Sequence, residues 1–152
     1  MAVCPACGGR SEFVGRRCHL DGAYAVREEA IEKCANEPLL GRCLGETFAL
    51  VDVLGRGVGG TVFEGHHVRL ESRCAVKVLH RENRADSQQV RRFRREARSV
   101  AMLSHPNIVK IFDYDIEGGI AYLAMEFIEG PLLASLSPYH QLGMPATLRI
   151  LS

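Results

Sequence analysis

The stretch that decides the fold runs from Leu54 to Lys77, with the sequence LGRGVGGTVFEGHHVRLESRCAVK. It opens with a glycine-rich turn and closes on an apolar run that contains one lysine, Lys77. Apolar residues alternate before and after the glycines, which predicts two strands joined by a flexible hairpin. Glycines let a backbone approach a ligand closely because they lack a Cβ. Exposed N–H groups of such a hairpin can cover phosphates, and a strand lysine can pair with their charge.

Two other glycine-rich phosphate motifs do not fit this stretch. The dinucleotide fingerprint has its glycines between a strand and a helix, and the Walker loop ends in Gly-Lys-Ser or Gly-Lys-Thr. Here Gly60 is followed by strand-like residues, and no lysine follows it directly. The pattern G-x-G-x-x-G-x-V, with Ala-Val-Lys on the next strand, is far more specific than the glycines alone.

Five motifs in order resemble the amino-terminal lobe of a protein kinase, of the bacterial, eukaryotic-like serine/threonine type. After the hairpin and the lysine strand come Arg95-Glu96-Ala97, His105-Pro106-Asn107-Ile108-Val109 and Met125-Glu126-Phe127-Ile128-Glu129-Gly130. The resemblance covers residues 45–152. It implies an α+β fold with a five-stranded antiparallel sheet and one helix packed on it, with the carboxyl-terminal lobe missing.

The resemblance also implies an ATP site. Lys77 would contact the phosphates, and Glu96 would hold Lys77 through an ion pair; these two are the expected catalytic residues. Adenine would pair with the hinge backbone from Glu126 to Ile128, with Met125 at the back of the pocket. The residues expected to bind ATP are Leu54, Gly55, Arg56, Gly57, Val58, Gly59, Gly60, Thr61, Val62, Ala75, Lys77, Met125, Glu126 and Ile128.

A kinase further needs an aspartate near the substrate hydroxyl and carboxylates that hold magnesium. In this family they come from His-Arg-Asp and Asp-Phe-Gly segments, and neither occurs in this sequence. We therefore expect the ATP-binding part of a longer serine/threonine kinase that acts on protein substrates, inactive alone. One alternative is a non-catalytic nucleotide-binding or scaffold module, similar to a pseudokinase. Another is a metal-binding interaction protein whose glycine loop is incidental.

Residues 1–22 contain two similar turns, Cys4-Pro5-Ala6-Cys7-Gly8 and Cys18-His19-Leu20-Asp21-Gly22. Backbone N–H groups in such turns can face thiolates. The segment resembles a zinc ribbon whose fourth cysteine is replaced by Asp21, so Cys4, Cys7, Cys18 and Asp21 are the expected zinc ligands. A degenerate ribbon without metal is the other interpretation. Three further residues could serve in place of Asp21: His19, Cys34 or Cys43.

Two helices are predicted outside these motifs. Residues 23–38, within a linker spanning 23–44, carry apolar positions among charged ones and end at Pro38. Residues 87–103 place Phe93 and Ala97 on one face. An arginine cluster lies opposite, and without a nucleic-acid motif beside it we expect a solvated face rather than nucleic-acid binding: Arg91, Arg94, Arg95 and Arg98.

Composition is compatible with these predictions. The chain has 152 residues, is 47% hydrophobic and carries a formal charge of +1, which argues against a strongly electrostatic partner. It has neither a signal-peptide pattern nor an apolar run of membrane-spanning length, so we expect a cytoplasmic protein. Its six cysteines are then better interpreted as metal ligands or buried thiols than as disulfides.

Overall fold

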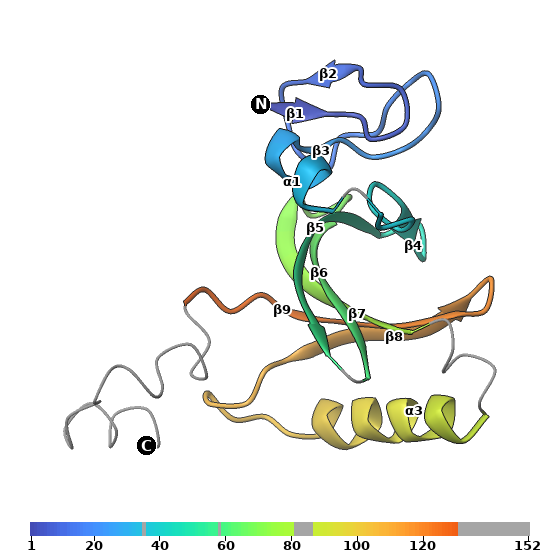
Figure 1. Cartoon of the computed structure of the whole chain (residues 1–152). Helices are drawn as coiled ribbons and strands as arrows, with labels where there is room; N and C mark the ends of the chain where they lie inside the picture. The colour runs from blue at the N-terminus through green and yellow to red at the C-terminus, as the bar shows by residue number, and fades with distance from the viewer. Residues whose placement is uncertain (35, 58, 81–86, 131–152) are drawn as a thin grey trace, which may run out of the picture.

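The computed structural model describes residues 1–34, 36–57, 59–80 and 87–130 (Figure 1). Within them lie two antiparallel sheets and two helices, α1 (Glu28–Lys33) and α3 (Ser87–Ala101). Neither of these helices is long and apolar enough to cross a lipid bilayer. The strands are β1 (Ala2–Val3), β2 (Arg10–Ser11), β3 (Val26–Arg27), β4 (Cys43–Leu44), β5 (Phe48–Gly57), β6 (Gly60–His67), β7 (Ser72–Leu79), β8 (Ile111–Glu117) and β9 (Ile120–Glu126).

The smaller sheet has the strand order β2-β1-β3 and holds together the N-terminal segment, defined here as residues 1–34 and 36–42. Val3 pairs with Val26, so the sheet extends past residue 22, the expected end of the ribbon. The helix predicted over 23–38 is wrong in extent, because α1 covers only Glu28–Lys33. Residues 26 and 27, near the start of the predicted helix, are extended instead, because they pair with β1 and this pairing buries Val26 fully.

The larger sheet has the strand order β4-β5-β6-β7-β9-β8, with every neighbouring pair antiparallel. It contains the five strands expected from the kinase resemblance. A sixth strand, the two-residue β4, pairs Cys43 with Ala49 at the edge of β5.

The first four residues of strand β5 are buried, so this part of the strand is covered on both faces. Phe48 and Leu50 point into the main core, where they lie with Phe63 and Tyr122. Ala49 and Val51 point the other way and pack against Val26 of the N-terminal segment. Since side chains alternate along a strand, this one strand joins the two parts of the molecule.

Helix α3 packs on the larger sheet through Phe93 and Ala97, one turn apart. These two side chains contact a cluster on β7 and β9 made of Leu79, Ala121 and Leu123. The predicted helix is therefore confirmed, ending at Ala101 rather than Leu103. The arginines at positions 91, 94, 95 and 98 are exposed, as expected.

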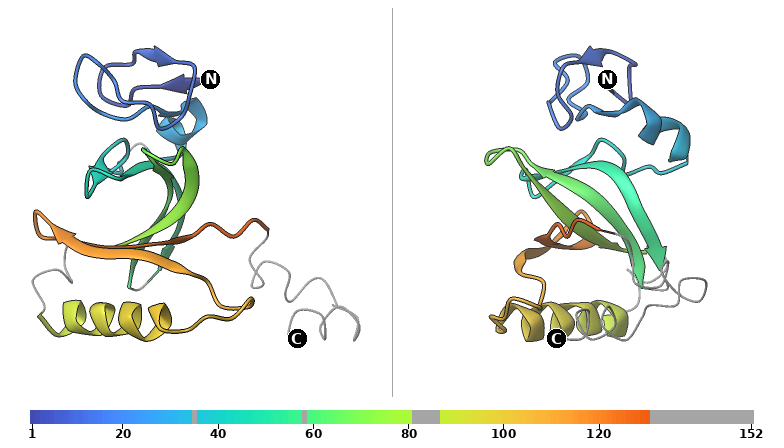
Figure 2. Two further views of the ribbon diagram at one scale, coloured as in Figure 1. Left: turned by 180° about the vertical axis from the view of Figure 1, so that it is seen from behind. Right: turned by 90° about the vertical axis from the view of Figure 1, so that its left-hand side faces the viewer.

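The N-terminal segment and helix α3 both pack on one face of the larger sheet. In antiparallel strands, directly paired residues share a face. Lys77 pairs with Val62 and Ala75 with Glu64, so these four side chains lie on the same face. In Figures 1 and 2 the N-terminal segment and α3 lie at opposite ends of the larger sheet.

Candidate functional site

A cavity of about 810 Å³ lies between the β5–β6 hairpin, strand β7 and the residues that follow β9. The structure brings most of the expected ATP-binding residues together around it. Val58 lies outside the described residues. The expected residues that line the cavity are Leu54, Gly55, Arg56, Gly57, Gly59, Gly60, Val62, Ala75, Lys77, Met125, Glu126 and Ile128.

Thr61 is the expected residue that does not line the cavity. It is buried, with 7% of its surface exposed, and it pairs with Val78. Adjacent residues of a strand point to opposite faces, so Thr61 points away from the face that carries Val62 and Lys77. The Thr61 side chain therefore lies away from the cavity, and a contact between Thr61 and ATP stays a prediction.

Lys77 and Glu96 form the expected ion pair, with 3.4 Å between Nζ and Oε1. Lys77 projects from β7, and its ammonium lies 5.6 Å from the ring centroid of Phe93 on α3. The lysine side chain is 25% exposed and the glutamate side chain 59%. Because Phe93 fixes α3 against the sheet, the helix delivers Glu96 to the edge of the cavity beside the lysine.

Four lining residues were not predicted from the sequence, and a fifth, Phe127, falls within the predicted hinge range without having been named as a binding residue. Arg73 could have been found, because residues 73, 75 and 77 alternate along β7 and therefore share a face. The hinge residues Phe127 and Glu129 also line the cavity and contact Arg73: its guanidinium lies 4.0 Å from the Phe127 ring centroid and 2.6 Å from Glu129 Oε1. The remaining two are Val109 and Gly130.

The donors and the shape of this cavity fit a nucleotide. Its volume falls in the range of about 300–1,000 Å³ found for ligand pockets. Apolar side chains of Val62, Ala75 and Met125 offer a surface for a planar base, while Lys77 offers a cation for phosphate. At the hinge, the Glu126 N–H already donates to the Lys110 carbonyl oxygen at 2.8 Å.

A second group of functional side chains lies in the N-terminal segment. Potential ligand atoms of Cys4, Cys7, Cys18 and Asp21 all lie within 4.8 Å of one another. The two sulfurs of Cys7 and Cys18 are 3.7 Å apart, and the Cys4 thiol donates to Asp21 at 3.2 Å. Tetrahedral zinc places two sulfur ligands about 3.8 Å apart and sulfur and oxygen ligands about 3.5 Å apart. The four residues therefore fit a zinc ion.

The two turns that carry these ligands have matching backbones. The Gly8 N–H donates to the Cys4 carbonyl oxygen, and the Gly22 N–H donates to that of Cys18, at 2.9 and 3.0 Å. Both glycines have positive φ, 73° and 78°, which other residues rarely adopt. The sequence interpretation of two copies of one turn is confirmed by this geometry.

Local hydrogen bonds favour the charged forms of two of these groups. The pKa of Asp21 is lowered to about 2 by hydrogen bonds from the Cys7 thiol and the Ala23 backbone N–H, with a smaller contribution from Cys4. The pKa of the Cys18 thiol is lowered by the backbone N–H groups of Leu20 and Asp21. The pKa of the Cys7 thiol is instead raised to about 12, chiefly by its hydrogen bond to Asp21, so zinc binding there must release that proton.

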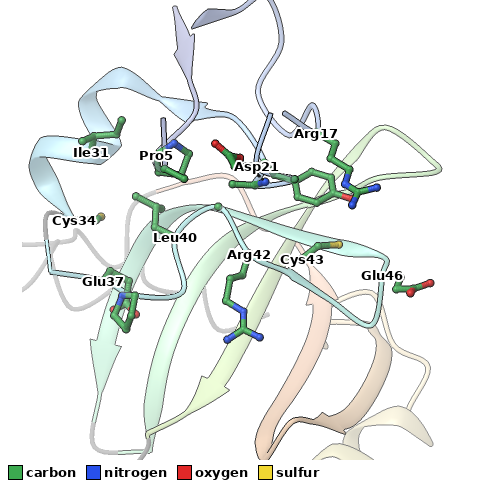
Figure 3. A pocket seen from close by; sticks show the side chains of 16 residues that line it. Pro5, Arg17, Asp21, Ile31, Cys34, Glu37, Leu40, Arg42, Cys43 and Glu46 are labelled. Carbon is green, nitrogen blue, oxygen red and sulfur yellow. Dashed lines mark hydrogen bonds between the residues drawn. The ribbon is translucent and has the colours of Figure 1, made fainter. Parts of the chain in front are cut away.

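The alternative fourth ligands lie elsewhere. Within the described residues, the only cluster of potential metal ligands consists of the three cysteines and Asp21, and it does not include His19. Cys34 is buried in the main core, with its sulfur 3.7 Å from Asp52. Cys43 lies on β4 and lines a separate cavity of about 870 Å³ between the N-terminal segment and the larger sheet (Figure 3).

Comparisons with known proteins agree with this geometry. The serine/threonine-protein kinase Pkn1 of Myxococcus xanthus is 46% identical over 101 residues, 66% of this chain and 14% of Pkn1. PrkC of Bacillus subtilis, also a serine/threonine-protein kinase, is 37% identical over 95 residues, 62% of this chain and 15% of PrkC. This chain therefore matches only a small share of the length of these curated relatives.

A crystal structure of the kinase domain of Mycobacterium tuberculosis PknI has the same fold. The TM-score is 0.52 at 31% sequence identity, over 60% of this chain and 36% of that chain. The family model described as "Protein kinase domain" matches residues 48–148. This range contains the glycine hairpin, Lys77, α3 with Glu96, and the hinge, so the chain belongs to the protein kinase family.

Proposed function

We propose that this chain is the ATP-binding part of a serine/threonine protein kinase that transfers phosphate from ATP to hydroxyl groups of protein substrates. The observation that carries the proposal is the Lys77–Glu96 ion pair, whose lysine lines the cavity beneath the glycine hairpin. The names of the relatives, all serine/threonine-protein kinases, support the substrate class.

In this proposal each wall of the cavity has a separate task. When bound, ATP supplies the phosphoryl group. The backbone of the β5–β6 hairpin covers the phosphates, and Lys77 pairs with their charge while Glu96 holds its ammonium in place. The hinge backbone from Glu126 to Ile128 holds the base, with Met125 behind it.

Catalysis requires more than these residues supply. Magnesium would be held by carboxylates of the Asp-Phe-Gly type, and the substrate hydroxyl would be oriented by an aspartate of the His-Arg-Asp type. Neither segment occurs in residues 1–152. We therefore propose that these residues alone bind nucleotide without transferring phosphate. Transfer by this chain that disappears in Lys77→Ala would contradict the proposal.

Calorimetric titration with ATP tests the binding step. Lys77→Ala removes a charged hydrogen-bond donor, so we expect ATP to bind at least about 10-fold more weakly than to the parent. Lys33→Ala is the matched control, because Lys33 is a lysine paired with Asp52 outside the cavity. Its affinity should stay within about 2-fold of the parent. Equal affinity in the parent and Lys77→Ala would overturn the assignment and favour a metal-binding interaction protein.

For the N-terminal segment we propose a structural zinc ion held by Cys4, Cys7, Cys18 and Asp21. The ligand spacing and the paired turns support this site. Such a site needs reduced thiols, and none of the six cysteines forms a disulfide. On this ground we propose that the protein works in a reducing compartment, namely the cytoplasm.

A further inference from the structure

A buried carboxylate connects the N-terminal segment to the kinase sheet. Glu64 of β6 is only 4% exposed. Both of its carboxylate oxygens accept hydrogen bonds from the guanidinium of Arg27 on β3, each at 2.8 Å. One of them, Oε1, also accepts a bond from Arg73 Nε at 3.0 Å. A single carboxylate therefore joins an arginine from each part of the molecule.

Arg73 carries this connection onward to the hinge. While its Nε bonds Glu64, its Nη1 bonds Glu129 at 2.6 Å, and its guanidinium lies against the Phe127 ring. Glu129 and Phe127 both line the nucleotide cavity. An unbroken series of side-chain contacts thus runs from β3 to the hinge.

The role of Arg27 follows from how charges are shared. A buried carboxylate needs its charge compensated and its oxygens hydrogen-bonded. Arg27 supplies two bonds to Glu64, which leaves Arg73 free to divide its donors between Glu64 and Glu129. Without Arg27, Glu64 would have only Arg73 as a charged partner, and we expect Arg73 to turn toward Glu64 and away from Glu129.

A second contact reaches the opposite wall of the cavity. Glu37 of the N-terminal segment pairs with Arg56 in the glycine hairpin, with 2.9 Å between Oε2 and Nη1. The Glu37 side chain is only 8% exposed, so its carboxylate is well shielded from water. Glu37 also lines the cavity shown in Figure 3, where the N-terminal segment faces the sheet.

We propose that the N-terminal segment positions both walls of the nucleotide cavity. Arg27 positions the hinge through Glu64 and Arg73, and Glu37 positions the glycine hairpin through Arg56. Both residues precede the range matched by the kinase family. The term nucleotide rests on the proposed function, whereas the positioning rests on contacts within this chain.

Hydrogen–deuterium exchange of the 152-residue chain tests the proposal without requiring ATP. In Arg27→Ala, we expect the amides of residues 127–130 to exchange about 3- to 10-fold faster, because a charge-assisted hydrogen-bond network is lost. Residues 54–57 should be unchanged. Glu37→Gln should show the reverse pattern, with faster exchange near Arg56 and an unchanged hinge.

Lys33→Ala is the matched control. Lys33 also joins the N-terminal segment to the sheet, through Asp52 at 3.0 Å and the Val53 carbonyl oxygen at 2.7 Å, and neither of these partners lines the cavity. It should leave exchange at both walls unchanged. Equal acceleration at the hinge by Lys33→Ala and Arg27→Ala would show that general loosening is responsible, and the proposal would fail.

Further variants guard against unfolding and against a purely structural role. If Arg27→Ala loses protection of β1 and β3, Arg27→Gln, which keeps much of the side chain, should give the same hinge effect with those strands intact. Arg27→Lys keeps the charge but not the paired donors, so it should restore part of the hinge protection. Unchanged hinge exchange in both Arg27→Ala and Arg27→Gln would overturn the proposal. If the parent binds no ATP but the variants show the expected exchange pattern, the proposed function is overturned while the positioning role stands.

Discussion

The N-terminal segment and the larger sheet are stabilised in different ways. The sheet encloses large side chains such as Phe63 and Tyr122, both nearly fully buried. The N-terminal segment buries mainly small ones, among them Ala2 and Ala25, and its strands are two residues long. So little apolar area cannot offset the cost of ordering a chain. The contrast shows that one region depends on its core, while the other depends on its ligand cluster and on its neighbour.

Metal removal should separate the two regions most strongly. We expect the purified chain to hold one zinc ion, and a strong chelator to unfold β1–β3 while the larger sheet stays folded. Structural zinc binding is on the order of 10 kcal/mol, which exceeds what this small segment gains from burial. Metal analysis, together with amide exchange before and after chelation, measures both effects.

Cys7→Ser should reproduce the effect of the chelator, because it removes one expected ligand. Cys43→Ser is its matched control, since Cys43 lies outside the ligand cluster, on β4. A parent without stoichiometric zinc, or a Cys7→Ser variant that binds as much zinc as Cys43→Ser, would contradict the site.

A substitution in the core of the larger sheet should destabilise that sheet, the region that metal removal leaves folded. Phe63→Ala empties a fully buried position and should lower the free energy of unfolding of the larger sheet by about 3–5 kcal/mol. Phe112→Ala, at a position that is 54% exposed, should change it by no more than about 0.5 kcal/mol. Urea unfolding monitored by circular dichroism gives both values. Equal decreases in the free energy of unfolding for the two variants would show that Phe63 does not belong to the core.

The junction between the regions should be sensitive to acid. Burial alone would raise the pKa of Glu64, but hydrogen bonds and charges from Arg27 and Arg73 outweigh it and lower the pKa below 4.5. A lowered pKa means that ionised Glu64 stabilises the fold above pH 4.5, and that this contribution is lost as pH falls through the folded-state pKa.

The comparison with Glu64→Gln isolates this group from other carboxylates. We expect the parent to be more stable than the variant at pH 7, and the difference to shrink steadily below pH 4.5. Urea unfolding of both proteins between pH 7 and pH 3 measures it. A difference that is independent of pH would mean that Glu64 does not titrate as the contacts require.

The smallest effect on stability should come from the Lys77–Glu96 pair. Glu96 is 59% exposed, and pairs of this kind contribute about 0–1 kcal/mol. Glu96→Gln should therefore unfold at nearly the parent urea concentration. In a longer protein that carries the missing catalytic segments, it should still reduce turnover, and Lys77→Met should nearly abolish it. Near-parental turnover in Lys77→Met would show that another residue contacts the phosphates.

Long elements with a clear period were predictable from the sequence, whereas short ones were not. The hairpin, strand β7 and helix α3 follow from alternation, glycine placement and the spacing of Phe93 and Ala97. Strands β3 and β4 have two residues each, too few to show a period. They exist because Val26 pairs with Val3 and Cys43 with Ala49, contacts that no local pattern reveals.

The candidate site was predictable where a motif or a strand period applies. Alternation would have placed the Thr61 side chain on the face away from the cavity and the Arg73 side chain on the cavity face, because Thr61 is next to Val62 and Arg73 is four residues from Lys77 along a strand. Glu64 gave no such signal, because a glutamate within a strand is normally solvated. Its burial depends on two arginines that come from different parts of the sequence.

Residues before and after the start of the family match share one core, and this has a practical consequence. The family match begins at Phe48, but Leu39 and Leu44 belong to the same core as Phe48. A protein trimmed to start at residue 48 would lose strand β4 and uncover Ala49 and Val51, which pack against Val26. Transplanting this lobe into another kinase should therefore succeed only if the cut precedes the N-terminal segment, so the unit that can be exchanged is larger than the unit that sequence similarity defines.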